Sequence, residues 1–125
     1  EKKYTKPSSK MDSIAKALPS VMKAKKIVNI AKKNKFITDS VKEAEDQLLS
    51  KIKEFELDSS EEKAGEVLMS LILVMKLKDV DPEIALDNTI NKFIIKFKKY
   101  EEMGPLDTIT KEEAVNRIEK IKNEN

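Results

Sequence analysis

The side chains that could carry out chemistry in this 125-residue chain are carboxylates, lysines and hydroxyls, because the sequence contains no His and no Cys. Without His there are no imidazole bases and no imidazole metal ligands. Without Cys there are no thiolates and no disulfides, which is typical of proteins in reducing compartments. A catalytic or binding site in this chain must therefore be built from acidic groups, lysine ammonium groups, hydroxyls or a bound ion.

Charge and hydropathy exclude several classes of function. The chain has 25 basic and 23 acidic residues, a net charge of +2, and its one arginine is Arg117. This balance gives no field for capturing nucleic acid, and base-edge readout relies heavily on arginine, so a nucleic-acid partner is not expected. The longest apolar stretch, Val67 to Met75, falls well short of the ~20 residues that span a bilayer. We therefore predict a cytoplasmic protein with no membrane contact.

The elements that must position any site are helices. Apolar periodicity predicts about five of them and no strands, which indicates an all-α helical bundle. One domain is expected over residues 11–121, between a flexible amino-terminal segment, residues 1–10, and a polar tail, residues 122–125. The expected helix starts carry N-terminal signals. These signals are Pro19; Ser40 with Glu43; Ser59 with Glu62; Asp81 with Pro82; and Thr110 with Glu113.

The third of these helices, roughly Ser60 to Lys78, is apolar on nearly every side. A helix of this kind must be buried on every side. A chain of this length has difficulty surrounding a helix completely by itself. We therefore expect part of this central helix to contact another subunit, and the alternative is a monomer that wraps it fully.

Several stretches, in this order and spacing, resemble the MazG family of nucleoside triphosphate pyrophosphohydrolases, particularly the carboxy-terminal domain of two-domain members. The resemblance covers about residues 10–121 and is most specific between Gly65 and Phe97. It rests on Ala17-Leu18-Pro19, Phe36 to Val41, Lys63 to Leu68, Val80 to Leu86, and Asn91-Lys92-Phe93 with Phe97.

This resemblance implies an all-α fold that assembles as a homodimer or a higher oligomer. It also implies hydrolysis of a nucleoside triphosphate to the monophosphate and pyrophosphate with Mg²⁺. The family supplies its metal ligands from a Glu-Glu-x-x-Glu motif on one helix and a Glu-x-x-Asp motif on the next. Residues three or four apart share a helix face, so each motif presents a line of oxygens, which are the ligands that Mg²⁺ requires.

Carried over residue by residue, the first motif falls on Ser50, Lys51 and Glu54, and the second falls on Lys63 and Glu66. Glu54 keeps the acid of the family, and Glu66 replaces an Asp with a longer carboxylate. Two acids and two lysines sum to zero charge at a site where the family has about five negative charges. Each lysine lies three residues before an acid on its own helix, so we expect ion pairs along each helix.

Two other placements of the site remain open. Glu43 and Gln47 could occupy the first motif in a different register, although the apolar positions then match less well. Glu62 lies four residues before Glu66 and could replace the missing acid, which would give a metal site of Glu54, Glu62 and Glu66. Downstream, Lys92 and Lys96 match positions where the resemblance implies a pair of basic residues that bind phosphate.

The function expected from the sequence is thus a MazG-like domain with a degenerate metal site and weak or no pyrophosphohydrolase activity. Such a domain would be retained for oligomerisation or nucleotide sensing. One alternative is an active Mg²⁺-dependent enzyme that uses Glu54, Glu62 and Glu66, and the other is a helical scaffold or interaction domain.

Overall fold

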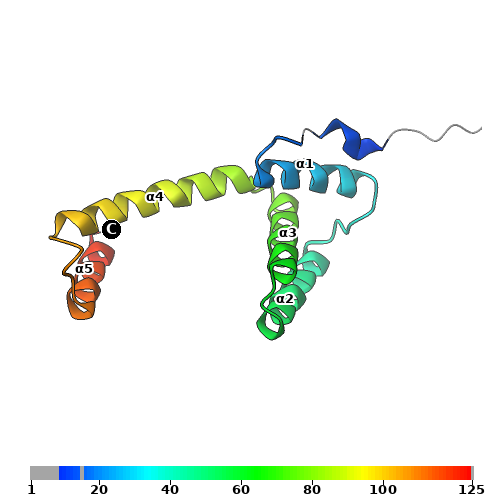
Figure 1. The fold of residues 1–125 in the computed structure, drawn as a ribbon. Helices are drawn as coiled ribbons and strands as arrows, with labels where there is room; N and C mark the ends of the chain where they lie inside the picture. The colour runs from blue at the N-terminus through cyan, green and yellow to red at the C-terminus, as the bar shows by residue number, and fades with distance from the viewer. Residues whose placement is uncertain (1–8, 15, 125) are drawn as a thin grey trace, which may run out of the picture. The chain divides into compact units, whose positions relative to one another are not determined.

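The computed structural model describes residues 9–14 and 16–124. This part of the chain contains five α-helices, one short 3-10 turn and no strand, so the predicted all-α class with about five helices is confirmed. Residues 1–8 of the predicted flexible segment lie outside the described residues, and Lys10 already belongs to the 3-10 turn. The elements are η1 (Lys10–Ser13), α1 (Ser20–Lys33), α2 (Val41–Leu57), α3 (Glu61–Leu77), α4 (Pro82–Glu102) and α5 (Lys111–Asn123) (Figure 1).

The chain divides into two compact units, one ending at Glu83 and the other beginning at Ile84. In the first unit α2 and α3 lie side by side, and α1 contacts α3 (Figure 1). Small side chains at two of the contact points, Ala24 on α1 and Ala44 on α2, allow the helices to approach closely. The core that results consists of Ala24, Val28, Ala44, Ile72, Leu73 and Val74.

Most of the predicted helix starts are confirmed by cap hydrogen bonds. The hydroxyls of Ser40 and Thr110 each accept from the backbone N–H three residues on, at 3.2 Å. The Asp81 carboxylate accepts from the N–H of Glu83 at 2.9 Å, and Pro82 takes the first helical position, where its missing N–H costs nothing. Pro19 is the N-cap of α1 and not its first helical residue.

The predicted start of the central helix is wrong by one residue. Ser60, and not Ser59, caps α3 by accepting from the N–H of Lys63 at 3.2 Å. The hydroxyl of Ser59 donates backwards to the carbonyl of Phe55, at the end of α2. Two adjacent serines carry the same sequence signal, and the end of α2 determines which of them is free to cap.

Helix α3 is not covered on every side within this chain. Ile72, Leu73 and Val74 in its second half are buried. Leu68 and Met69 in its first half are exposed, with Leu68 62% exposed. The alternative of a monomer that wraps this helix fully is therefore wrong, because α1 covers the second half of α3 and α2 covers one face only. Contact with another subunit stays a prediction.

The second unit is held together by Arg117, which is buried on α5. Its guanidinium donates to the carbonyls of Tyr100, Gly104 and Pro105 at 3.2–3.3 Å, and its Cζ lies 5.3 Å from the centre of the Tyr100 ring. The carbonyls of Gly104 and Pro105 lie beyond the end of α4, where intrahelical donors are missing, and Arg117 satisfies them; the carbonyl of Tyr100 also accepts from the N–H of Met103 at 3.3 Å. Helix α5 runs to Asn123, two residues into the predicted tail, and no helix of the described residues is long and apolar enough to cross a membrane.

Candidate functional site

The candidate site lies where the second half of α2 faces the first turns of α3. The connection between these helices, Asp58–Ser60, is short, because α2 continues to Leu57 and α3 begins at Glu61. A short connection fixes the antiparallel register of the two helices. Residues equally far from the bond between Asp58 and Ser59 then face one another, and this register pairs position 54 with position 63 and position 51 with position 66.

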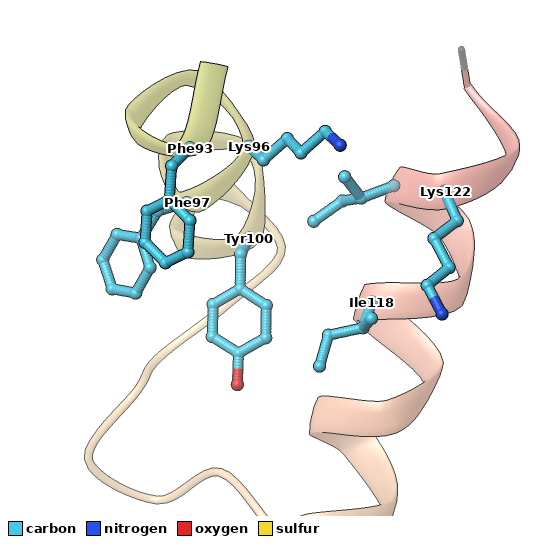
Figure 2. A pocket seen from close by; sticks show the side chains of 7 residues that line it. Phe93, Lys96, Phe97, Tyr100, Ile118 and Lys122 are labelled. Carbon is cyan, nitrogen blue, oxygen red and sulfur yellow. The ribbon is translucent and has the colours of Figure 1, made fainter. Parts of the chain in front are cut away.

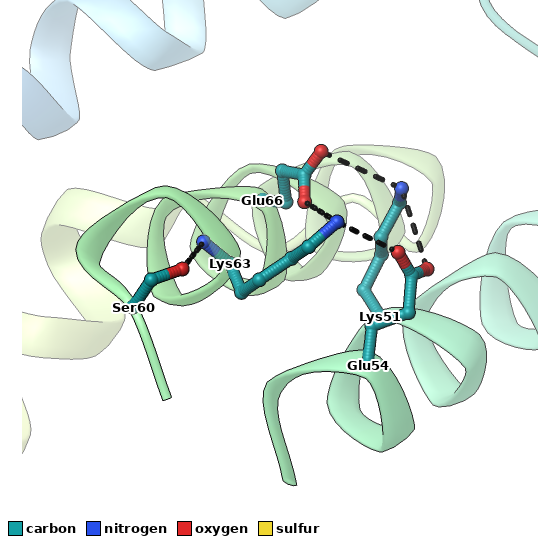
Figure 3. Close-up of polar contacts among 5 residues, drawn as sticks. All are labelled: Lys51, Glu54, Ser60, Lys63 and Glu66. Atoms are coloured by element: carbon teal, nitrogen blue, oxygen red, sulfur yellow. Dashed lines mark hydrogen bonds and ion pairs between the residues drawn. The ribbon is translucent and has the colours of Figure 1, made fainter. Parts of the chain in front are cut away.

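Four charged side chains at these positions form a closed ring of ion pairs, which we call the charge ring: Lys51, Glu54, Lys63 and Glu66 (Figure 3). Along each helix, Lys51 pairs with Glu54 and Lys63 with Glu66, both at 3.5 Å. Across the two helices, Lys63 lies 3.1 Å from Glu54 and Lys51 lies 3.7 Å from Glu66. The ion pairs expected along each helix are therefore present, and the two cross-helix contacts were missed.

The electrostatics of the charge ring favour the ionised forms of Glu54 and Lys63. The hydrogen bond from Lys63 lowers the pKa of Glu54, and the charge of Lys51 lowers it further. The same hydrogen bond raises the pKa of Lys63, with a further contribution from the charge of Glu66. The four side chains are 28–41% exposed, so water screens these interactions in part. The ring is a polar contact at the edge of the α2–α3 interface with no net charge.

The other acids considered at this site lie apart from the charge ring. Ser50 and Glu62 are exposed, and neither takes part in the ion pairs of the charge ring. In the alternative register, Glu43 accepts a hydrogen bond from the hydroxyl of Thr38 at 2.9 Å, near the N-terminus of α2, and Gln47 is exposed. Of the three predicted metal ligands, the structure brings Glu54 and Glu66 together and leaves Glu62 apart.

The donors of the charge ring do not fit a Mg²⁺ ion. Magnesium requires about six oxygen ligands in a nearly octahedral arrangement. Here two ammonium groups lie among the carboxylate oxygens, and no three acidic side chains of the described residues converge on a point that could hold a metal. Glu66 has one buried oxygen without a hydrogen bond, and its nearest ionic partner is the Lys63 ammonium at 3.5 Å. That single oxygen lies next to a cation and is a poor metal ligand.

The predicted phosphate-binding residues, Lys92 and Lys96, lie on α4 in the second unit, and both are exposed. Lys96 lines an apolar groove of about 430 Å³ between α4 and α5 (Figure 2). The aromatic rings of Phe97 and Tyr100 in this groove stack with their centres 5.8 Å apart. The groove was not predicted, because it depends on how α5 folds back on α4.

The chain is similar in sequence to the nucleoside triphosphate pyrophosphohydrolase/pyrophosphatase MazG of Thermotoga maritima, with 31% identity over 125 aligned positions. The alignment covers 97% of this chain and 48% of the relative, so the chain spans about half the length of the curated relative that it matches. No protein-family model matches the chain, and no solved structure matches it.

Proposed function

This chain belongs to the MazG family, and we propose that its α2–α3 site has exchanged metal ligands for an internal ring of ion pairs. The domain would then have weak or no nucleoside triphosphate pyrophosphohydrolase activity. It would be retained for oligomerisation or nucleotide sensing.

The charge ring is the observation that supports this proposal. A catalytic metal neutralises developing charge and positions water, and it needs carboxylates free to coordinate it. Glu54 and Glu66 are both engaged by lysines, and the lowered pKa of Glu54 reflects how closely Lys63 is bound to it. A metal would have to displace two ammonium groups that are already paired. Lys51 and Lys63 thus take the place of a metal cation at this position. Each of them pairs with Glu54 on α2 and with Glu66 on α3.

Nucleotide sensing is supported by Lys92 and Lys96. They lie four residues apart on one face of α4, and both are exposed. Lysine binds phosphate as a point charge and needs no metal for this contact. A domain without hydrolysis can therefore still contact the phosphates of a nucleotide.

Pyrophosphate release from a panel of nucleoside triphosphates, with Mg²⁺ or Mn²⁺, tests the loss of activity. We expect release close to the background rate. Robust turnover that Glu66→Gln abolishes and the exposed control Glu56→Gln leaves intact would instead establish the active enzyme that uses Glu54, Glu62 and Glu66.

Nucleotide binding is measured separately by calorimetry with EDTA present. We expect Lys92→Ala with Lys96→Ala to weaken binding, and the matched control Lys42→Ala with Lys53→Ala, on exposed positions of α2, to leave it unchanged. Equal nucleotide binding by both double variants would refute the proposal that Lys92 and Lys96 bind the phosphates.

A further inference from the structure

The net charge of +2 is distributed unevenly along the chain. Residues 13–38, which include all of α1, contain seven lysines and no acidic residue. The other 18 basic residues stand against all 23 acidic ones, so the rest of the chain has a net charge of −5. The expectation of no nucleic-acid partner rests on the sum of these two parts. Because salt screens charges beyond about 10 Å, the potential around α1 depends on its own lysines and their neighbours, and not on that sum.

Most lysines of this segment have no counter-charge. Lys25 is the exception, because its ammonium lies 2.8 Å from the carboxylates of Asp81 and Glu83 at the start of α4. In the part of the chain that the structure describes, the other six form no ion pair, and all of them except Lys23 are exposed. We call these six residues the basic surface: Lys16, Lys23, Lys26, Lys32, Lys33 and Lys35.

The centre of the basic surface lies on the side of α1 that is turned away from the core. Lys26 and Lys33 are seven residues apart, which is two helical turns, so they share one face. The buried residues Ala24, Val28 and Ala31 occupy the opposite face. Two turns of helix separate the two lysines by about 10 Å. A linear polyanion that lies along this face can therefore contact several lysines at once.

An exposed aromatic ring lies at the end of the basic surface. Helix α1 ends in a turn in which the N–H of Phe36 donates to the carbonyl of Ala31 at 2.9 Å and the N–H of Lys35 donates to that of Lys32 at 3.1 Å. Lys35 takes the left-handed conformation that this turn requires, with φ at 61°. An apolar residue at the position of Phe36 commonly packs back on the last turn of the helix. Phe36 is instead 84% exposed, so its ring is available to a partner.

The combination of unpaired lysines and an exposed ring indicates the chemistry of that partner. Surfaces that bind single-stranded nucleic acid combine lysines, which contact phosphates, with aromatic rings on which unpaired bases stack. The basic surface contains no Arg, the residue most used to read base edges. We propose that the basic surface and Phe36 bind single-stranded nucleic acid without sequence preference, with the lysines on the phosphates and the ring stacked on a base.

Other polyanions fit these observations less well. A membrane-surface helix lays its apolar face into the lipid, and the apolar face of α1 is packed in the core. An acidic protein segment would satisfy the lysines but would leave Phe36 without a flat ring to stack on. The bases of a duplex are already stacked on one another, so they are not available to Phe36.

This inference goes beyond the proposed function and does not depend on it. The charge ring lies on α2 and α3, and the lysine pair proposed to bind nucleotide lies in the second unit. The failure of either proposal therefore leaves the other unaffected.

Fluorescence anisotropy of a labelled oligouridylate of about 12 nucleotides, titrated with the whole chain in EDTA, tests the proposal. Each phosphate that a lysine neutralises contributes about −0.7 to the slope of log affinity against log salt. Six lysines predict a slope of about −4, so affinity should fall roughly 300-fold between about 50 and 200 mM salt.

Lysine variants should change this slope. Lys26→Gln with Lys33→Gln should make it shallower by about 1.4, because two phosphate contacts are lost. Lys42→Gln with Lys53→Gln is the matched control, because it removes the same charge from exposed positions of α2, and it should leave the slope unchanged.

Removal of the ring should act on affinity alone. Phe36→Ala should weaken binding about tenfold at every salt concentration and leave the slope unchanged, because stacking releases no counterions. Leu57→Ala, which removes a 91% exposed apolar side chain at the end of α2, is the matched control and should have no effect. Far-UV circular dichroism of each variant confirms that its helices are folded.

Two other polyanions distinguish the classes of partner. Polyglutamate supplies charge without bases and should bind about tenfold less tightly than the oligouridylate at equal salt. Vesicles of phosphatidylserine and phosphatidylcholine should not displace the oligouridylate. The proposal is overturned by equal binding of polyglutamate, by displacement by the vesicles, or by no binding at roughly 100 µM in low salt. It is also overturned if Phe36→Ala binds as the parent does or if both pairs of lysine variants give the same slope.

Discussion

Replacing both lysines of the charge ring with glutamates should create a divalent-cation site where the structure has ion pairs. Lys51→Glu with Lys63→Glu changes the charge of these four positions from zero to −4. Contacts that are now attractive at 3.1–3.7 Å become contacts between carboxylates. Without metal, the double variant should be less stable than the parent, because four carboxylates repel across the α2–α3 interface.

Metal should reverse this loss of stability. The ring is 28–41% exposed, so a weak all-oxygen site is expected, with a dissociation constant on the order of 10⁻⁴–10⁻³ M. Free Mn²⁺ at ten times that constant multiplies the folding equilibrium constant about tenfold, which raises Tm by roughly 5 °C in a domain of this size. The parent chain should show neither binding nor a change in Tm at the same concentration.

Calorimetry with Mn²⁺ and thermal unfolding with and without the metal measure this prediction. Lys42→Glu with Lys53→Glu is the matched control, because it makes the same change in net charge at exposed positions of α2. Lys51→Met with Lys63→Met removes the ammonium groups without adding ligands and should not bind. If the glutamate variant does not bind Mn²⁺ at 10 mM, or binds no better than the control, the placement of the metal motif on these positions is refuted.

Two further predictions concern pH and backbone geometry. Because the pKa of Glu54 is lowered from 4.5 and that of Lys63 is raised from 10.5, stabilisation by the charge ring is complete between these values. It is lost as the pH falls through the folded pKa of Glu54 or rises through that of Lys63. Lys63→Met should therefore raise the pKa of Glu54 in an NMR titration, and Lys53→Met should not; an unchanged pKa in Lys63→Met would contradict this cause. Gly104→Ala should destabilise the chain to urea by about 1–3 kcal/mol, because φ is +143° and a Cβ atom would lie 2.7 Å from the guanidinium of Arg117. Gly65→Ala, in a helix with no atom within 4 Å of the added Cβ, should stabilise it by about 0.5–1 kcal/mol, and equal effects of the two substitutions would argue against this account.

The helices were predictable because their signals are local. Ser40, Asp81 and Thr110 each cap a helix by a hydrogen bond to a backbone N–H two or three residues further on. Both partners of such a bond lie in one short stretch of sequence, so the pattern can be recognised there. The same reasoning chose the wrong serine at α3, since Ser59 and Ser60 both lie three residues before a possible partner. It also left open whether the chain itself or another subunit covers Leu68, because periodicity reports that a side chain is apolar and not what covers it.

The candidate site was predictable along each helix and not between helices. Spacing of three residues pairs Lys51 with Glu54 and Lys63 with Glu66 wherever those helices form. Contacts between helices depend on register, which the length of the connection determines. One signal for the register was present and was not used: the two residues of each cross-helix pair are equally far from the bond between Asp58 and Ser59. The contacts of Arg117 could not be predicted from the sequence for a related reason. They join α5 to carbonyls that lie 12–17 residues earlier in the chain.

Under the proposed loss of metal ligands, the charge ring explains how the α2–α3 pair keeps its architecture. Acids that face each other across two helices repel unless a cation lies between them. When the metal is removed from such a site, the repulsion between the acids can be relieved in two ways. The acids can be lost, or the chain can supply a positive charge from its own side chains. This sequence retains Glu54 and Glu66 and places Lys51 and Lys63 beside them, so the cation is covalently attached and always present. Such a pair holds α2 against α3 without any ligand, whereas a metal site would make that contact depend on metal concentration. Under this proposal, the same lysines that oppose hydrolysis hold α2 against α3 at all times, which is the property that the proposed oligomerisation domain requires.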